Sequence, residues 1–137
     1  NILLYAHDRD AGEKYRRAGA LLQEIWEAKT GVLSTQVLEE CYVNITRKIP
    51  KPLSKEKARD LIRNYFAWNI VVIDGPMILE ATQLEERLRI SFWDALILAA
   101  AKKAKALLLL SEDFQHDRRY EGVTVRNPFI TDPKTEN

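Results

Sequence analysis

The chain has 137 residues, of which 46% are hydrophobic and 30% are charged, and its formal net charge is only +1. This composition excludes a disordered chain, and the length suits one hydrophobic core, so we expect residues 1–137 to form a single domain. The apolar runs 95–101 and 106–110 are too short to span a bilayer and the single cysteine, Cys41, excludes a disulfide framework, which together favour a cytoplasmic protein without a membrane segment.

The first half of the chain predicts helices around one short strand. Apolar residues recur at helical spacing over 13–28, and Gly31 ends that helix. Residues 32–33 form a short strand candidate. Ser34 or Thr35 can cap a second helix that runs to Lys48. Ser54 caps a third helix, which is basic, after two prolines have ended the second.

The second half alternates strands with helices. The β-branched run within 69–74 is typical of a buried parallel strand, and a helix follows over 75–89. A helix over 92–105 is apolar almost all round and is therefore predicted to be buried. A second buried strand is predicted over 106–110, and a last strand over 123–126. This alternation predicts an α/β sandwich with a mostly parallel sheet.

Asp94 is the most informative acidic residue. Its neighbours one and two turns along the predicted helix are apolar, so the carboxylate projects from an apolar face. A buried carboxylate without a partner is unfavourable by several kcal/mol or more. The run Ser91-Phe92-Trp93-Asp94 also reads as a capping box, which is a purely structural explanation. The two roles are compatible, because a helix N-terminus favours the anion that a metal ion needs.

Asp113 follows the predicted strand 106–110 at its carboxyl end. In open α/β sheets this edge is where ligands bind, although a polar turn residue is the ordinary explanation for an acid there. Ser111 adds a hydroxyl that could hold a metal-bound water or orient Asp113. Glu112 should point elsewhere, because alternate residues of an extended segment face opposite ways.

Glu39 and Glu40 flank the apolar stripe of the second helix on opposite sides, and helix geometry does not choose between them. Glu40 shares its side with Asn44, one turn on. Their spacing alone favours the interpretation that both are ordinary glutamates exposed to solvent. Three carboxylates on separate elements of one small α/β domain nevertheless suggest a site for a hard cation such as Mg²⁺ or Mn²⁺, which prefers oxygen ligands.

Four stretches, in this order along the chain, together resemble the PIN-domain family of ribonucleases, and most closely the VapC-like toxins of type II toxin–antitoxin pairs. Residues 1–6 (NILLYA) resemble the segment directly after the first catalytic aspartate in the family's Asp-x-Asn motif. Residues 35–48 resemble the helix that carries the second acid, which aligns with Glu40. Residues 91–95 (SFWDA) and 109–114 (LLSEDF) resemble the motifs of the third and fourth acids, and residues 123–129 are similar to the last strand.

The resemblance implies a PIN-like three-layer sandwich. It places the family's first strand, with its terminal aspartate, immediately before Asn1, so that we expect this strand to be missing from the chain. Asn1 would be the Asn of Asp-x-Asn, and residues 2–6 are then expected to open a helix rather than a strand.

The resemblance further implies an endoribonuclease that hydrolyses RNA phosphodiester bonds with Mg²⁺ or Mn²⁺. Asp94 would hold the metal, Glu40 and Asp113 would complete the acidic cluster, and Ser111 and Asn1 would be supporting polar groups. The implied partners are RNA, a second copy of the chain in a homodimer and a cognate antitoxin protein.

Two alternatives remain open on the sequence. One is a non-catalytic PIN module that binds RNA or a protein partner. The other is a phosphoryl-accepting receiver domain, which is also a small parallel α/β fold, but the strand that ends in Ser111-Glu112-Asp113 lacks the phosphate-contacting lysine that such a domain needs.

Overall fold

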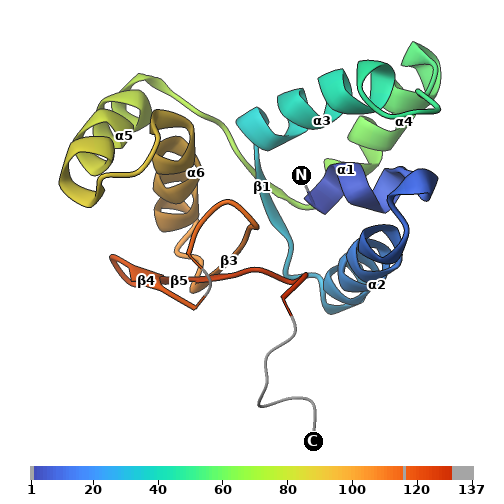
Figure 1. Ribbon diagram of the computed structural model, residues 1–137. Helices are drawn as coiled ribbons and strands as arrows, with labels where there is room; N and C mark the ends of the chain where they lie inside the picture. Colours follow the sequence, from blue (N-terminus) through green and yellow to red (C-terminus); the bar gives the residue numbers. More distant parts are fainter. Residues whose placement is uncertain (1, 116, 131–137) are drawn as a thin grey trace, which may run out of the picture.

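The computed structural model describes residues 2–115 and 117–130 and has the predicted mixed α/β fold (Figure 1). Its elements are α1 (Ile2–His7), the 3-10 helix η1 (Arg9–Ala11), α2 (Glu13–Ala28), β1 (Val32–Ser34), α3 (Thr35–Arg47), α4 (Lys55–Tyr65), β2 (Asn69–Val71), α5 (Gly75–Leu88), α6 (Phe92–Lys103), β3 (Leu108–Leu110), β4 (Arg119–Tyr120) and β5 (Val123–Arg126). Each predicted helix is present, including α1 at the start of the chain. Figure 1 shows α5 and α6 on one side and α1 to α4 on the other, with β1 between them.

Side-chain caps define where the helices begin. The Ser34 hydroxyl accepts the N–H of Val37 at the start of α3, and Ser91 accepts the N–H of Asp94 at the start of α6, at 3.2 and 3.1 Å. Ser54 caps α4 in the same way. A cap of this kind stabilises a helix by about 1 kcal/mol. The predicted caps are therefore confirmed, and two of them fix the starts of the helices that carry Glu40 and Asp94.

The strands form two sheets within the described residues. β1 pairs with β2 in parallel, and β3 pairs with β5 in parallel. The mostly parallel pairing is confirmed, but the strands do not join into one sheet. The short strand β4, which was not predicted, pairs antiparallel with β5. Its two-residue turn, Glu121-Gly122, has positive φ at both positions, as in hairpin turns that usually carry Asn-Gly.

The prediction that the segments 69–74 and 106–110 are fully buried is wrong. Val72 is 66% exposed and Leu107 is 79% exposed, and both lie just outside strands that are shorter than predicted. Among the described residues β2 pairs only with β1, and β3 only with β5. Each strand therefore keeps an open edge, and other elements do not cover both of its faces.

The helix α6 is the centre of the larger core. Leu98 is fully buried there, in one cluster with Leu84 of α5 and Val125 of β5. A second core cluster, around Ile45, joins α1, α3 and α4. The predicted burial of the helix over 92–105 is thus confirmed for most of its length. No helix in the described part of the chain combines the length and the apolar character needed to cross a bilayer.

Gly31 lets an aromatic cluster close over the end of α2. A Cβ atom at Gly31 would overlap the ring of Trp68, so only glycine allows this approach. The Trp68 ring packs in turn against Trp26 and Tyr65, with centroid distances of 5.6 and 5.4 Å. This contact holds α2 against the segment between α4 and β2, close to the start of β1.

Candidate metal and nuclease site

Asp94 lies at the third position of α6, where the Ser91 cap holds the helix start. Burial raises the pKa of the Asp94 carboxyl, hydrogen bonding with Ser91 opposes this, and the negative charges of Asp113 and Glu40 raise the pKa further. The structure thus brings the three acids, from α6, α3 and the loop after β3, within electrostatic reach of one another. Asp94 is half-buried, and the other two are exposed.

Gln36 links the two helices that carry Glu40 and Asp94. Its amide Nε2 donates to Glu40 Oε1 at 3.1 Å and to the backbone oxygen of Trp93 at 3.4 Å. The Gln36 side chain is buried, yet its Oε1 atom has no hydrogen-bond partner among the described residues. Sequence reasoning missed this residue, although its spacing of one turn from Glu40 is a signal that could have found it.

Hydrogen bonds in the loop after β3 hold Asp113 and its neighbours in place. The backbone N–H of Ser111 donates to the oxygen of Arg126 on β5, and the Ser111 hydroxyl accepts the N–H of Asp113, both at 3.1 Å. Glu112 instead accepts a hydrogen bond from the hydroxyl of Tyr5 at 2.7 Å. The prediction that Glu112 points elsewhere is confirmed, and Ser111 holds the backbone of Asp113.

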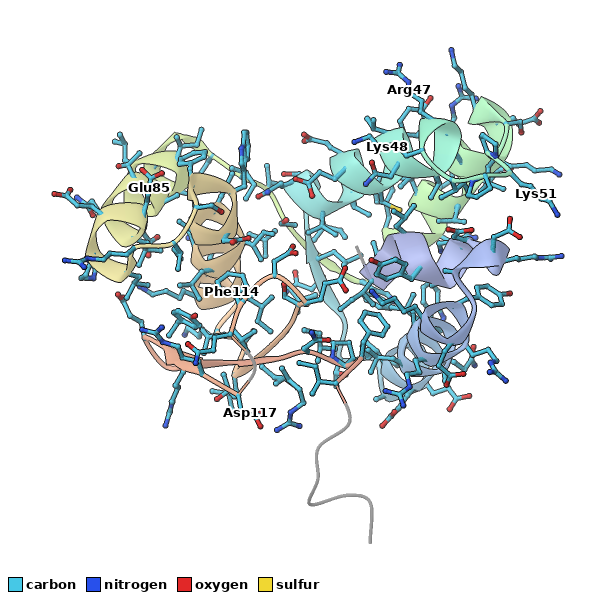
Figure 2. The ribbon with its side chains drawn as sticks, in the orientation of Figure 1. Arg47, Lys48, Lys51, Glu85, Phe114 and Asp117 are labelled. Carbon is cyan, nitrogen blue, oxygen red and sulfur yellow. The ribbon has the colours of Figure 1, made fainter. Side chains whose placement is uncertain are left out.

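No lysine or arginine within residues 2–115 and 117–130 forms an ion pair with the Glu40, Asp94 or Asp113 carboxylates. Arg47, Lys48 and Lys51 gather instead at the end of α3 that lies away from α6 (Figure 2). Among the described residues, the three acids therefore have no ion-paired cation. Such a group attracts a cation, because mutual repulsion of the carboxylates is relieved when a positive charge binds.

The residues present fit a divalent metal ion in type but do not form a closed metal centre. The part of the chain that the structure describes holds no group of three His, Cys, Asp or Glu side chains arranged closely enough to hold a metal ion. The donor set of carboxylate oxygens is nevertheless the one that Mg²⁺ and Mn²⁺ prefer. The Gln36 amide next to Glu40 has a buried Oε1 atom without a hydrogen-bond partner among the described residues. Asn1, the other expected supporting group, lies outside the described residues.

The comparisons with known proteins show the family of the chain. No curated protein matches the chain. The sequence pattern of the PIN domain matches residues 1–122 and so covers all three acids and their helices and loop. Since this match spans most of the chain, the chain belongs to the PIN domain family, a family of nucleases.

Proposed function

We propose that the protein is a metal-dependent endoribonuclease that hydrolyses RNA phosphodiester bonds, with Mg²⁺ or Mn²⁺ as its cofactor. The observation that carries the proposal is that Asp94, Glu40 and Asp113, from three separate elements, lie within electrostatic reach of one another, without an ion-pair partner in the described residues. Three like charges brought together cost stability unless a cation compensates them. Unfavourable repulsion between like charges that a fold retains at the end of a strand is typical of a functional site.

Each proposed ligand has its own support. Asp94 sits at a helix N-terminus, which favours its charged form, whereas burial opposes that form. Gln36 holds Glu40, and Ser111 holds the backbone of Asp113. These carboxylates would bind and orient the cation. When bound, the divalent ion supplies a water of lowered pKa and neutralises charge on the phosphate.

RNA as the substrate is supported by an exposed aromatic side chain beside the acids. Trp93 precedes Asp94 on α6, and its indole is 62% exposed. Exposed aromatic rings bind single-stranded nucleic acids by stacking on bases, at about 1–3 kcal/mol per base. The basic residues Arg47, Lys48 and Lys51 offer phosphate contacts farther along α3 (Figure 2).

The adjacent residues Glu40 and Glu39 give a matched test of the proposal. In the full-length protein, Glu40→Gln is expected to reduce the rate of cleavage of a single-stranded RNA by roughly a hundredfold or more, because it removes a charge from the metal site. Glu39→Gln should cleave at the wild-type rate, since Glu39 lines a groove on the other side of α3. Chelation should stop cleavage and added Mn²⁺ should restore it. Cleavage that persists in a chelator, or equal rates for the two variants, would show that the proposed site is wrong.

We also propose that the protein is the toxin of a toxin–antitoxin pair and that its antitoxin docks on a groove between α3 and α4. The groove has a volume of about 590 Å³ and an apolar floor that includes Leu38 and Ile62. Val43 and Phe66 line it with 38% and 62% of their surfaces exposed. Arg59 also lines the groove and supplies a positive charge. An amphipathic segment with acidic side chains matches this combination of apolar and cationic lining residues.

Suppression of toxicity tests the groove. Expression of the full-length protein is expected to arrest growth, and a library of genomic fragments can be selected for a small protein that restores it. Phe66→Glu should abolish that rescue and leave the arrest intact, because a buried carboxylate would oppose docking of the partner. Rescue of the Phe66→Glu variant as complete as that of the wild type would mean that the antitoxin binds elsewhere.

A homodimer and a cytoplasmic location belong to the same proposal. A homodimer is supported by the exposed apolar side chains of Leu107 and Leu108 at β3, which are 79% and 45% exposed. A reducing cytoplasm is supported by Cys41, a buried and unpaired thiol.

The alternative of a non-catalytic PIN module predicts that the wild-type protein binds RNA without cleaving it. The cleavage assay that compares the wild type with the Glu40→Gln variant detects this outcome. Membership of the PIN family leaves the receiver-domain alternative without support.

A further inference from the structure

Glu112, the residue before Asp113, is bound away from the carboxylate site by two other helices. Its Oε1 atom accepts the hydroxyl hydrogen of Tyr5 on α1 at 2.7 Å, and its Oε2 atom accepts from Lys14 Nζ on α2 at 3.2 Å. Lys14 Nζ also lies 3.5 Å from the Tyr5 hydroxyl oxygen. We call Tyr5, Lys14 and Glu112 the Glu112 cluster. Only 17% of the Glu112 side chain is exposed, whereas 46% of the Lys14 side chain is exposed.

Aromatic packing holds the Glu112 cluster in place. The ring of Tyr5 meets the ring of Phe129 edge to face, with 5.3 Å between the centroids. Lys14 Nζ lies 4.7 Å from the Tyr5 centroid and 5.5 Å from the Phe129 centroid, which is the range of cation–π attraction. The ammonium is therefore fixed by a carboxylate, a hydroxyl and two rings.

The loop that carries Asp113 is anchored both before and after Glu112 in the chain. Before it, the backbone of Ser111 is hydrogen-bonded to Arg126 on β5 at 3.1 Å. After it, Phe114, which is labelled in Figure 2, is buried, and its ring packs on Tyr120 with 5.3 Å between the centroids. Between these anchors Glu112 joins α1 and α2, whereas the neighbouring Asp113 is exposed and its charge acts on Asp94.

We propose that the Glu112 cluster positions Asp113 for metal binding. Tyr5 and Lys14 hold Glu112, and Glu112 thereby keeps the neighbouring Asp113 carboxylate turned toward Asp94. Glu112 is not itself a metal ligand in this proposal, since each of its carboxylate oxygens already has a donor. The inference rests on the proposed metal-dependent function. Residues that orient the ligands of a metal site typically change metal affinity by roughly 10–100-fold when they are replaced.

The test is direct binding of Mn²⁺ to the metal-free full-length protein, measured by titration calorimetry. Glu112→Gln removes the charge that holds Lys14, and Tyr5→Phe removes only the hydroxyl. Each is expected to weaken Mn²⁺ binding by roughly tenfold. Lys14→Arg keeps a cation in place and should retain most of the wild-type affinity. In cleavage assays the two weakened variants should need more Mn²⁺ for half-maximal rate but approach the wild-type kcat at saturating Mn²⁺.

A double variant and a control separate positioning from general stability. The double variant Tyr5→Phe/Glu112→Gln should bind Mn²⁺ no more weakly than the poorer single variant, because both changes disrupt the same set of contacts. Glu121→Gln is the control. Glu121 pairs with Arg87 at 2.7 Å and with Lys102 at 3.0 Å, near the other end of α6, so its loss should lower stability without changing Mn²⁺ affinity.

The outcomes distinguish the inference from the function on which it rests. If the wild type binds Mn²⁺ and both single variants bind it equally well, the positioning role is wrong and the metal site stands. If the wild type takes up no Mn²⁺, the proposed metal-dependent function is wrong, and the inference with it. Should Glu112→Gln fail to fold, the milder Tyr5→Phe variant decides the question by itself.

Discussion

Replacing Asp94 with asparagine is expected to lower the rate of RNA cleavage by roughly a thousandfold or more and to make the metal-free protein more stable at neutral pH. The loss of activity follows because asparagine removes the charge of the proposed metal ligand on which both other acids act. The gain in stability follows because the wild-type carboxylate is half-buried beside Glu40 and Asp113. Asparagine has nearly the same shape, so the fold should be preserved.

The stability difference should depend on pH in a defined direction. Burial, together with the charges of Asp113 and Glu40, raises the pKa of Asp94 above its ordinary value of 3.8. Below that value the carboxyl is protonated in both the folded and the unfolded chain, so its burial does not penalise the wild type. As the pH rises through the raised pKa, the folded protein must carry the buried charge and loses stability. The advantage of Asp94→Asn should therefore be absent in acid and complete at neutral pH.

Thermal unfolding in the presence of a chelator, from about pH 3 to pH 8, measures this difference. Asp60→Asn, at an exposed position on α4, is the control and should show neither the loss of cleavage nor the rise in melting temperature. If the Asp94→Asn variant cleaves RNA at the wild-type rate, Asp94 is not part of the proposed metal site. A melting temperature below that of the wild type at neutral pH would mean that capping of α6 outweighs the burial of charge.

Leu98→Ala is expected to lower the free energy of unfolding by about 2–5 kcal/mol. Leu98 is fully buried on α6, in one cluster with Leu84 and Val125, so its truncation leaves a cavity between α5, α6 and β5. Small domains have only about 5–15 kcal/mol of stability in total, so this single change removes a large part of it. Urea unfolding followed by circular dichroism measures the effect.

The matched control for Leu98 is a leucine on the neighbouring helix. Leu79 on α5 is 68% exposed, and Leu79→Ala should change the free energy of unfolding by no more than about 0.5 kcal/mol. Equal losses for the two variants would show that α6 is not the centre of the core. A small loss at Leu98 together with a large one at Leu79 would instead point to an interface that covers α5.

Local sequence signals determined most of the helical framework. Ser34, Ser54 and Ser91 begin the helices that their positions predict, because a capping hydroxyl acts on a backbone N–H only three residues away. The nearly continuous apolar character of residues 92–103 predicted that α6 is buried. The order of the acidic motifs also predicted the PIN family that the comparison shows. These features depend on neighbours in the chain, so the sequence alone contains them.

Tertiary structure alone decided which side chains meet. Helix geometry left Glu39 and Glu40 equivalent, and only the family resemblance selected Glu40; in the fold the charge of Glu40 acts on Asp94, whereas Glu39 lines the groove between α3 and α4. The partner of Glu112 is Tyr5, 107 positions earlier in the chain. No periodicity or local motif encodes a contact over such a separation, because it forms only when packing has brought α1 against the loop after β3. The exposed faces of the strands and the strand β4 likewise follow from which elements pair, and not from the residues of any one segment.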